Sequence, residues 1–423
     1  MHARNRVFLL FALLALFQVA ILFVAVPWFQ KNYNGYSIDG FQDQYDLIAM
    51  NLLQGHGFRV YADTSETLLR MPGYIYFLAG LFFLFGKSLT AVKVTNMVLA
   101  FAVAYLMYLL GRRVIKHEGW SIAAPAIYLA HPATLAAESR GGVEIFFSFL
   151  IVLFVFTLYR ALEHDRLRDY VLLGFVLGLT VLTRSTPIVF PAVLFIYLLC
   201  RRRSLDVRPV ALRIGAMTLV AFVLVLPWLV RNYQVAGVFA PKETVAGLSA
   251  YNGYYLNKHW SSDKSGQQLL KESVEEQHML AEQLGLPHQP GYIQYFYDVR
   301  DEVRFNDYLL DRVFSEYRAS PLMAARTLAL NFLRFWFHAG VWKATALNVV
   351  LTLPLVVLVG FGIHDGIRRR LDIWPIVLVA GTVMLMHLPV LGVARHHVPL
   401  IPFLLILAVI PFVRGNQSAG MPT

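Results

Sequence analysis

Long apolar segments, separated by short basic ones, run through most of the chain. The first extends from Val7 to Val26, and nine more cover about 91–110, 121–136, 145–160, 170–183, 187–200, 211–230, 344–363, 373–392 and 398–413. Each is a candidate membrane-spanning helix, because a helix of about 20 apolar residues is long enough to cross the hydrocarbon core of a bilayer. The pattern predicts an all-α polytopic membrane protein with about ten transmembrane helices.

The basic clusters between these segments predict the topology. The segments "GRRVIKH", "YRALEHDRLR", "RRRSLDVRPVALR" and "DGIRRRLD" each follow an even-numbered crossing, and His2, Arg4 and Arg6 precede the first one. Because basic residues favour the cytoplasmic side, we expect cytoplasmic N- and C-termini in the inner or plasma membrane. The sequence "PWFQKNYNG" after the first segment lacks the small-residue pattern of a signal cleavage site, so we expect an uncleaved first helix.

Two further apolar segments, Pro72–Gly86 and Pro321–Gly340, would break this topology if they crossed the membrane. We expect them to be helices in the outer interface. Long exterior regions then cover the first loop, 27–70, and residues 231–325. The predicted organisation is an N-terminal transmembrane module (1–230) that carries the first exterior loop, an exterior segment with an interfacial helix (231–343), and C-terminal transmembrane helices (344–423).

The amino-acid composition supports a membrane protein and bears on how the net positive charge is interpreted. Of the 423 residues, 57% are hydrophobic and only 15% are charged, which excludes an ordinary soluble globular protein. The net charge of +11 could suggest nucleic-acid binding, but the basic residues lie in the short loops that membrane topology explains. We therefore expect membrane lipids and no nucleic acid as partners. The single cysteine, Cys200, rules out an intrachain disulfide.

Acidic residues lie unusually close to the predicted membrane boundary. Asp39, Asp43 and Asp46 belong to the first exterior loop, where apolar residues recur at helical spacing from Gly40 to Gln54. Asp39 is a plausible helix N-cap, and Asp43 and Asp46 would lie on neighbouring parts of the helix surface. Glu144 opens the fourth crossing. Carboxylates beside the hydrocarbon are costly to desolvate, so a chemical role competes with that of a solvated surface.

Several arginines are expected on the same exterior side, against the positive-inside trend. Arg70 lies in the first loop, Arg184 ends the fifth crossing, and Arg395 precedes the last one. Contact with lipid headgroups would explain each arginine singly. Together they favour a shared phosphate site, because guanidinium groups match phosphate oxygens. Exterior acids and cations on an apolar body predict a lipid-phosphate substrate that enters sideways from the bilayer.

The sequence gives no requirement for a metal or an organic cofactor. His396 and His397 are adjacent, which makes them a poor pair of ligands on a helix, and hydrogen bonding or packing is the expected role. No spacing of His, Asp and Glu residues requires a metal, although a divalent cation could assist at the phosphate.

Six motifs together resemble a known family. They are "YDLIAMNLLQGHGF" after Asp43, then "LLRMPGYIYFLAGLFFLFG", "GVEIFFSFL", "GLTVLTRSTP", "LPWLVRNYQVAGVFAPKET" and "RHHVPLIPFL". In this order they resemble the polyprenyl-phosphate-dependent glycosyltransferases of the C superfamily, in particular the bacterial relatives of protein O-mannosyltransferases and of the lipid A aminoarabinose transferase. The resemblance implies a multi-pass fold, a catalytic Asp in the first exterior loop, and a polyprenyl-phosphate sugar donor.

The resemblance also implies site roles. Asp43 or Asp39 would be the catalytic base, Glu144 the second acidic residue, Arg70 and Arg184 the contacts to the donor phosphate, and Arg395 the basic residue before the last crossing. Many relatives carry the Asp four residues before the tyrosine, where this chain has Phe41. We favour Asp43 over Asp39 because Asp43 is predicted to share the helix of the tyrosine.

The predicted function is an inverting glycosyltransferase that moves a sugar from the lipid donor to a hydroxyl of a glycan, lipid or protein acceptor. One base and a cationic site for the leaving group suffice for a single inverting displacement, whereas a glycosidase needs two carboxylates astride the bond. The alternatives are a lipid-linked oligosaccharide ligase or polymerase, and a transporter or flippase of lipid-linked sugars.

Overall fold

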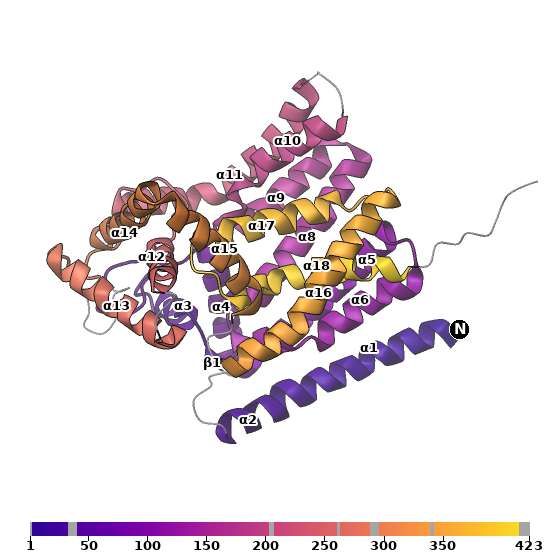
Figure 1. Cartoon of the computed structure of the whole chain (residues 1–423), viewed down its shortest axis with the longest axis horizontal. Helices are drawn as coiled ribbons and strands as arrows, with labels where there is room; N and C mark the ends of the chain where they lie inside the picture. The colour runs from indigo at the N-terminus through magenta and orange to yellow at the C-terminus, as the bar shows by residue number, and fades with distance from the viewer. Residues whose placement is uncertain are drawn as a thin grey trace, which may run out of the picture.

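The computed structural model describes residues 2–32, 40–202, 207–259, 263–287, 296–338 and 342–413, and nearly all of its regular structure is helical (Figure 1). The N-terminal half contains α1 (His2–Ala20), the π-helix η1 (Ile21–Ala25), α2 (Val26–Asn32), α3 (Tyr45–Leu53), α4 (Pro72–Phe85), α5 (Leu89–Val114), α6 (Glu118–Ala130), α7 (Pro132–Glu138), α8 (Glu144–His164), α9 (Leu167–Thr183), η2 (Thr186–Val189), α10 (Phe190–Arg202) and α11 (Arg208–Ala236).

The C-terminal half continues with the same kind of structure. Its elements are α12 (Val245–Lys258), α13 (Gly266–Gln283), α14 (Val299–Ala319), α15 (Pro321–Phe337), α16 (Trp342–Arg368), α17 (Trp374–His387), η3 (Ala394–Leu400), α18 (Ile401–Ala408) and η4 (Ile410–Phe412). In Figure 1, α12, α13 and α14 lie together at one end of the molecule, and the long apolar helices form the rest of the body. The predicted all-α polytopic fold is confirmed.

The predicted count of ten crossings is not confirmed. Within the described residues, six helical stretches are long and apolar enough to span a membrane, namely 5–31, 89–114, 144–164, 208–236, 342–368 and 394–412, and 72–85, 186–201 and 374–387 are shorter apolar helices. The segment predicted at 121–136 is interrupted at His131. Pro132 follows it, and the residue before a proline is driven out of the α conformation, so α6 ends and α7 begins there.

The two segments predicted as interfacial helices are helical. They form α4 and α15, and each ends close to the predicted boundary. One side of α4 is buried, including Tyr74 and Leu78, whereas Phe83 and Phe85 are exposed. Their position at the membrane interface stays a prediction.

The exterior segment folds into helices where its sequence predicts them. The stretches "QQLLKESVEEQHMLAEQLGL" and "DEVRFNDYLLDRVFSEYR" form most of α13 and α14. A capping box starts α13, since the Ser265 side chain accepts from the N–H of Gln268 and the Gln268 side chain accepts from the N–H of Ser265. Both α13 and α14 pack on α12, so this region is a helical cluster and not an open loop.

A two-residue parallel strand pair joins the first loop to the body. Among the described residues, β1 (Gly40–Phe41) and β2 (Arg140–Gly141) are the only strands, with Gly40 opposite Arg140 and Phe41 opposite Gly141. A Cβ atom at Gly141 would lie 2.4 Å from Cδ1 of Phe41, so only glycine fits this approach. The pair brings the residues that follow Phe41 close to the start of α8.

Candidate functional site

The turn between β1 and α3 carries Asp43. The helix predicted from Gly40 to Gln54 is shorter, because α3 begins only at Tyr45. Asp43 and Gln44 both have a positive φ, of 57° and 59°, and so form a left-handed turn. The prediction that Asp43 shares the helix of the tyrosine is therefore wrong. A non-glycine residue in this conformation stores strain of a kind that collects at functional sites. Asp39 lies outside the described residues.

The turn directs the Asp43 carboxylate at two guanidinium groups. Arg395 donates from Nη1 to Oδ2 at 2.9 Å and from Nη2 to Oδ1 at 3.4 Å, and Nη2 of Arg70 lies 3.6 Å from Oδ1. The Asp43 side chain is 20% exposed. Burial would raise its pKa, but the charges of Arg395 and Arg70 outweigh burial and hold the pKa of Asp43 below its usual range. Three residues far apart in the sequence thus form one ionic cluster.

Tyr45 packs under this cluster. The Arg70 guanidinium lies over its ring, with Cζ 5.3 Å from the ring centroid, and the ring of Tyr74 meets it edge-on at 5.2 Å. A guanidinium above an aromatic face is held by the ring quadrupole. Burial raises the pKa of Tyr45 to about 12, so its hydroxyl keeps its proton at neutral pH. The ring fixes the orientation of Arg70 and adds no charge.

A second ionic pair lies where α8 begins and α9 ends. Glu144 is the first residue of α8, and its Oε1 lies 3.7 Å from Nη2 of Arg184, which follows the last residue of α9. The Cζ of Arg184 is 5.3 Å from the ring centroid of Phe147. Glu144 is 3% exposed, yet within the described residues neither of its carboxylate oxygens accepts a hydrogen bond. A buried carboxylate with free acceptor capacity is unusual and suits contact with a ligand.

Sequence reasoning gave no role to Arg140 of β2. Burial lowers the pKa of Arg140, while the charge of Glu144 acts in the opposite sense. Its Nε is buried and has no hydrogen-bond partner in the described parts of the chain, and the same holds for Nε of Arg70. The position of Arg140 directly after "AES" gives no signal by itself, because the pairing of β2 with β1 is what brings it to the cluster.

The charges of the site do not balance. Four arginines, Arg70, Arg140, Arg184 and Arg395, accompany the two carboxylates of Asp43 and Glu144. With the nearby Glu243, whose charge also acts on Arg70, these seven groups leave an excess of one positive charge around buried donors that have no partner in the described chain. The arrangement can bind an anion with several oxygen atoms, because guanidinium groups hold such oxygens at fixed geometry.

Asp46 does not have the solvated surface predicted for it. It is 8% exposed, in the first turn of α3, and its Oδ2 is 2.7 Å from Nζ of Lys87. The expectation of a solvated helix face at Asp46 is wrong, since the short α3 packs along α4.

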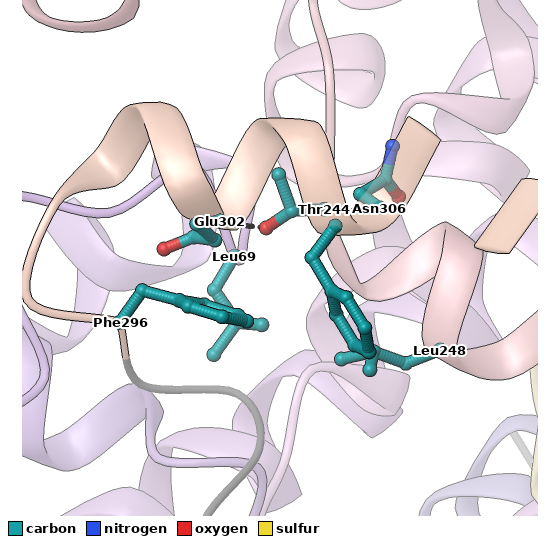
Figure 2. Close-up of a pocket in the computed structure, with 7 residues that line it drawn as sticks. Leu69, Thr244, Leu248, Phe296, Glu302 and Asn306 are labelled. Atoms are coloured by element: carbon teal, nitrogen blue, oxygen red, sulfur yellow. Dashed lines mark hydrogen bonds between the residues drawn. The ribbon is translucent and has the colours of Figure 1, made fainter. Parts of the chain in front are cut away.

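A buried carboxylate anchors the segment that leads to Arg70. Glu302 of α14 accepts hydrogen bonds from the Thr67 hydroxyl at 2.7 Å, from the Leu68 N–H at 3.0 Å, and from the Thr244 hydroxyl. Figure 2 shows Glu302 and Thr244 in this small pocket, with Leu69 and Phe296 beside them. Burial raises the pKa of Glu302 to about 7. The sequence analysis did not select Glu302, because its sequence context is the same as that of the surface carboxylates of an amphipathic helix.

The described residues offer no group of three or more His, Cys, Asp and Glu side chains that could hold a metal ion. His397 lies with Nδ1 3.1 Å from the Phe335 carbonyl oxygen, and the ring of His396 lies tilted beside that of His387, with centroids 4.7 Å apart. Nδ1 of His396 has no hydrogen-bond partner among the described residues. His397 thus makes a hydrogen bond, and His396 packs against His387.

Comparison with known proteins gives matches over parts of the chain. Residues 70–229 match the family described as dolichyl-phosphate-mannose-protein mannosyltransferase, a range that includes Arg70, Glu144 and Arg184. The lipopolysaccharide core galacturonosyltransferase RgtA of Rhizobium johnstonii is 31% identical over 174 residues, which are 39% of this chain and 33% of that protein. The match thus spans about a third of the length of this curated relative.

One solved structure shows a similar overall fold, and a second is reported beside it. The archaeal oligosaccharyltransferase AglB from Archaeoglobus fulgidus, in complex with an inhibitory peptide and a dolichol-phosphate, is 15% identical, with a TM-score of 0.51 over 96% of this chain and 50% of that one. ArnT from Cupriavidus metallidurans, bound to undecaprenyl phosphate, is 14% identical, with a TM-score of 0.44 over 95% of this chain and 77% of that one.

The class that emerges is a multi-pass, all-helical membrane protein with a charged site at the ends of its helices. The resemblance to the polyprenyl-phosphate-dependent glycosyltransferases of the C superfamily, predicted from the motifs, is confirmed.

Proposed function

We propose that this chain is an inverting glycosyltransferase that moves a sugar from a polyprenyl-phosphate donor to an acceptor hydroxyl at the exterior membrane face. The observation that carries the proposal is the ionic cluster in which Asp43 contacts both Arg395 and Arg70. The pair of Glu144 and Arg184 supports it, because it adds an acid and a cation at neighbouring helix ends.

The donor phosphate is the proposed ligand of the arginines. A polyprenyl phosphate leaves with negative charge developing on its phosphate, and guanidinium groups fixed beforehand stabilise that charge. Arg70 and Arg184 contact the phosphate in this proposal, and Arg395 completes the cationic side. The side chains of Arg70 and Arg184 are only 12% and 14% exposed, which favours a fixed site over lipid-headgroup contacts.

Asp43 is the proposed base. An acceptor hydroxyl must lose its proton as it attacks the anomeric carbon, and a carboxylate at the membrane edge can take that proton. Contact with Arg395 and Arg70 makes Asp43 a weak base before the donor binds, because those charges lower its pKa. A donor phosphate would share the two guanidinium groups and weaken their hold on the carboxylate, so donor binding itself would raise the basicity of Asp43.

Glu144 is the second acidic residue in this mechanism. Its two carboxylate oxygens, which accept no hydrogen bond among the described residues, suit the acceptor hydroxyl or a sugar hydroxyl as donors. If a divalent cation assists, Asp43 and Glu144 are the carboxylates that would hold it, and it would supply further stabilisation of negative charge. No step of the proposed displacement depends on it, since one base and a cationic site for the leaving group are sufficient.

The relatives agree with this donor class. The names of RgtA and of the matched family describe sugar transfer, and AglB was solved with a dolichol-phosphate. The proposed location is the inner or plasma membrane, with both termini cytoplasmic. Acceptors of the proposed class are glycans, lipids or proteins that present a hydroxyl group outside the membrane.

A transfer assay with defined donors tests the proposal. Arg70→Ala and Arg184→Ala should each raise the KM for the lipid donor about tenfold or more, as expected for the loss of a hydrogen-bonded charge pair. Lysine at either position should restore only part of the activity, because the guanidinium fork is lost.

Arg300→Ala is the matched control, because Arg300 is an exposed arginine of α14. Unchanged donor KM in both site variants would reject the phosphate role. Turnover of a polyprenyl diphosphate in place of the monophosphate would favour the oligosaccharide ligase alternative, and movement of intact donor across the membrane would favour the flippase.

A further inference from the structure

One carboxylate joins the two segments that carry Arg70 and Arg184. Oε1 of Glu243 accepts from the N–H of Met71 at 3.3 Å, and Oε2 accepts from the Ser185 hydroxyl at 2.8 Å. Met71 directly follows Arg70, and Ser185 directly follows Arg184. Glu243 thus hydrogen-bonds to the neighbour of each arginine, and its charge also acts on Arg70.

The same two segments also pack against each other. A Cβ atom at Gly73 would lie 2.8 Å from the Leu182 carbonyl oxygen and 2.8 Å from Oγ1 of Thr183, so the start of α4 touches the end of α9. This contact depends on the missing side chain of Gly73 and on no atom of Glu243. The two helix ends should therefore stay together when Glu243 is replaced, and only the orientation of the residues beside them should loosen.

Glu243 is itself held by its neighbour. The N–H of Thr244 donates to the Leu68 carbonyl oxygen at 3.0 Å, and the Thr244 hydroxyl donates to Glu302. Glu302 in turn accepts from the Leu68 N–H, and Figure 2 shows Glu302 and Thr244 close to Leu69. The backbone at Glu243 is therefore fixed before its carboxylate reaches Met71 and Ser185.

We infer that Glu243 is a positioning residue that fixes the spacing of the Arg70 and Arg184 guanidinium groups and so sets the affinity of the site for the phosphate of a lipid. The inference rests on the proposed function for the role of the two arginines. Two forks bind one phosphate strongly only when both are held close to the productive geometry, within about 0.5 Å. A carboxylate with one oxygen for each segment provides that link.

Direct binding of undecaprenyl phosphate, which carries no sugar, to the full chain in detergent measures this affinity without catalysis. Glu243→Ala should weaken binding about tenfold, which matches the energy of hydrogen bonds to a charged group. Glu243→Gln keeps an acceptor oxygen for Met71, and Ser185→Ala removes one bond only, so each should weaken binding about threefold. Glu243→Ala with Ser185→Ala should bind like Glu243→Ala alone, because both changes remove the same link.

Glu272→Gln is the matched control, because Glu272 pairs with Lys264 at 2.7 Å in the exterior cluster. The transfer assay adds a second reading: the donor KM of Glu243→Gln should rise while kcat at saturating donor stays within about twofold, since a positioning defect is overcome by excess ligand. If Glu243→Ala does not fold, Glu243→Gln and Ser185→Ala carry the test.

The outcomes separate the two proposals. Wild-type affinity in the Glu243 and Ser185 variants, or additive losses in the double variant, would overturn the inference and leave the proposed function intact. Failure of the wild-type chain to bind undecaprenyl phosphate at all would overturn the donor site itself.

Discussion

At the scale of single residues, Asp43 is held by contacts that lower its basicity. Its carboxylate contacts Arg395 and Arg70 from a left-handed turn, and their charges depress its pKa. A base in this state is active only when something else engages the guanidinium groups. The proposed donor phosphate meets that condition, so substrate binding and activation of the base are linked by the same two arginines.

Asp43→Asn should abolish sugar transfer, with a loss on the order of a hundred- to ten-thousand-fold, because the amide cannot accept the hydroxyl proton. The variant should bind undecaprenyl phosphate at least as tightly as the wild type, since Arg395 and Arg70 lose their competing anion. Asp63→Asn, an exposed change in the same loop, is the control. Retained transfer in Asp43→Asn would remove Asp43 from the mechanism and direct attention to Asp39.

Asp46→Asn should lower stability and not chemistry. Asp46 is buried in the first turn of α3 and pairs with Lys87 at 2.7 Å, so the amide leaves the ammonium without its counter-charge. We expect a loss of about 1–2 kcal/mol in the free energy of unfolding, typical of a hydrogen bond to a charged group. Thermal unfolding in detergent measures it, and kcat of the folded fraction should be unchanged. Lowered kcat at normal stability would contradict this assignment.

At the scale of elements, α14 is tied to the segment before α4 by Glu302. Its carboxyl takes hydrogen bonds from Thr67, Leu68 and Thr244, three groups on two separate segments. Burial raises the pKa of Glu302 to about 7, so near neutral pH both the protonated and the ionised form of the carboxyl are populated. We therefore expect the attachment of α14 to the arginine-bearing segment to depend on pH.

Glu302→Gln should remove a pH dependence of stability. The pKa of Glu302 is about 7 in the folded chain and lies near the model value of 4.5 when unfolded. Below about pH 4.5 both states are protonated; between these values the folded state holds the extra proton, so stability falls as pH rises to about 7. The difference is at most on the order of 3 kcal/mol. Unfolding measured from pH 4.5 to 8 should show this slope in the wild type and lose it in Glu302→Gln; equal slopes would contradict the prediction.

At the scale of the whole molecule, the charged groups of the site come from the ends of helices, apart from Arg140 in the strand β2. Asp43 precedes α3, Arg70 precedes α4, Glu144 starts α8, Arg184 follows α9, and Arg395 lies in η3. Their meeting requires these ends to lie on one side of the membrane. The topology predicted from the basic clusters meets that requirement.

Single-cysteine labelling in a Cys200→Ser background tests the topology. Cysteines at Tyr61 and Lys271 should react with a membrane-impermeant reagent added outside, whereas cysteines at Glu118 and Arg369 should react only after the membrane is opened. The exposure of Lys271, Glu118 and Arg369 makes the labelling readable. Labelling of position 369 from outside would overturn the order of crossings.

The sequence by itself determined the helices and the chemical types in the site. Apolar periodicity located nearly every long helix, because burial in lipid requires continuous apolar runs with all backbone groups bonded internally. Asp43, Glu144, Arg70, Arg184 and Arg395 could be selected from the sequence, since a charge beside an apolar run is costly and so stands out against its neighbours.

Only the tertiary structure decided which of these charges meet. Asp43 lies in a left-handed turn, and β1 pairs with β2 through a close approach of Phe41 to Gly141. The spacing of apolar residues in the sequence predicts neither feature. Arg140, Glu243 and Glu302 gain their roles from contacts with distant segments, and in the sequence they resemble ordinary polar residues. Hydrophobic burial produces a local pattern of apolar residues that can be recognised in the sequence. The partner of a buried charge, in contrast, is fixed only when the helices pack.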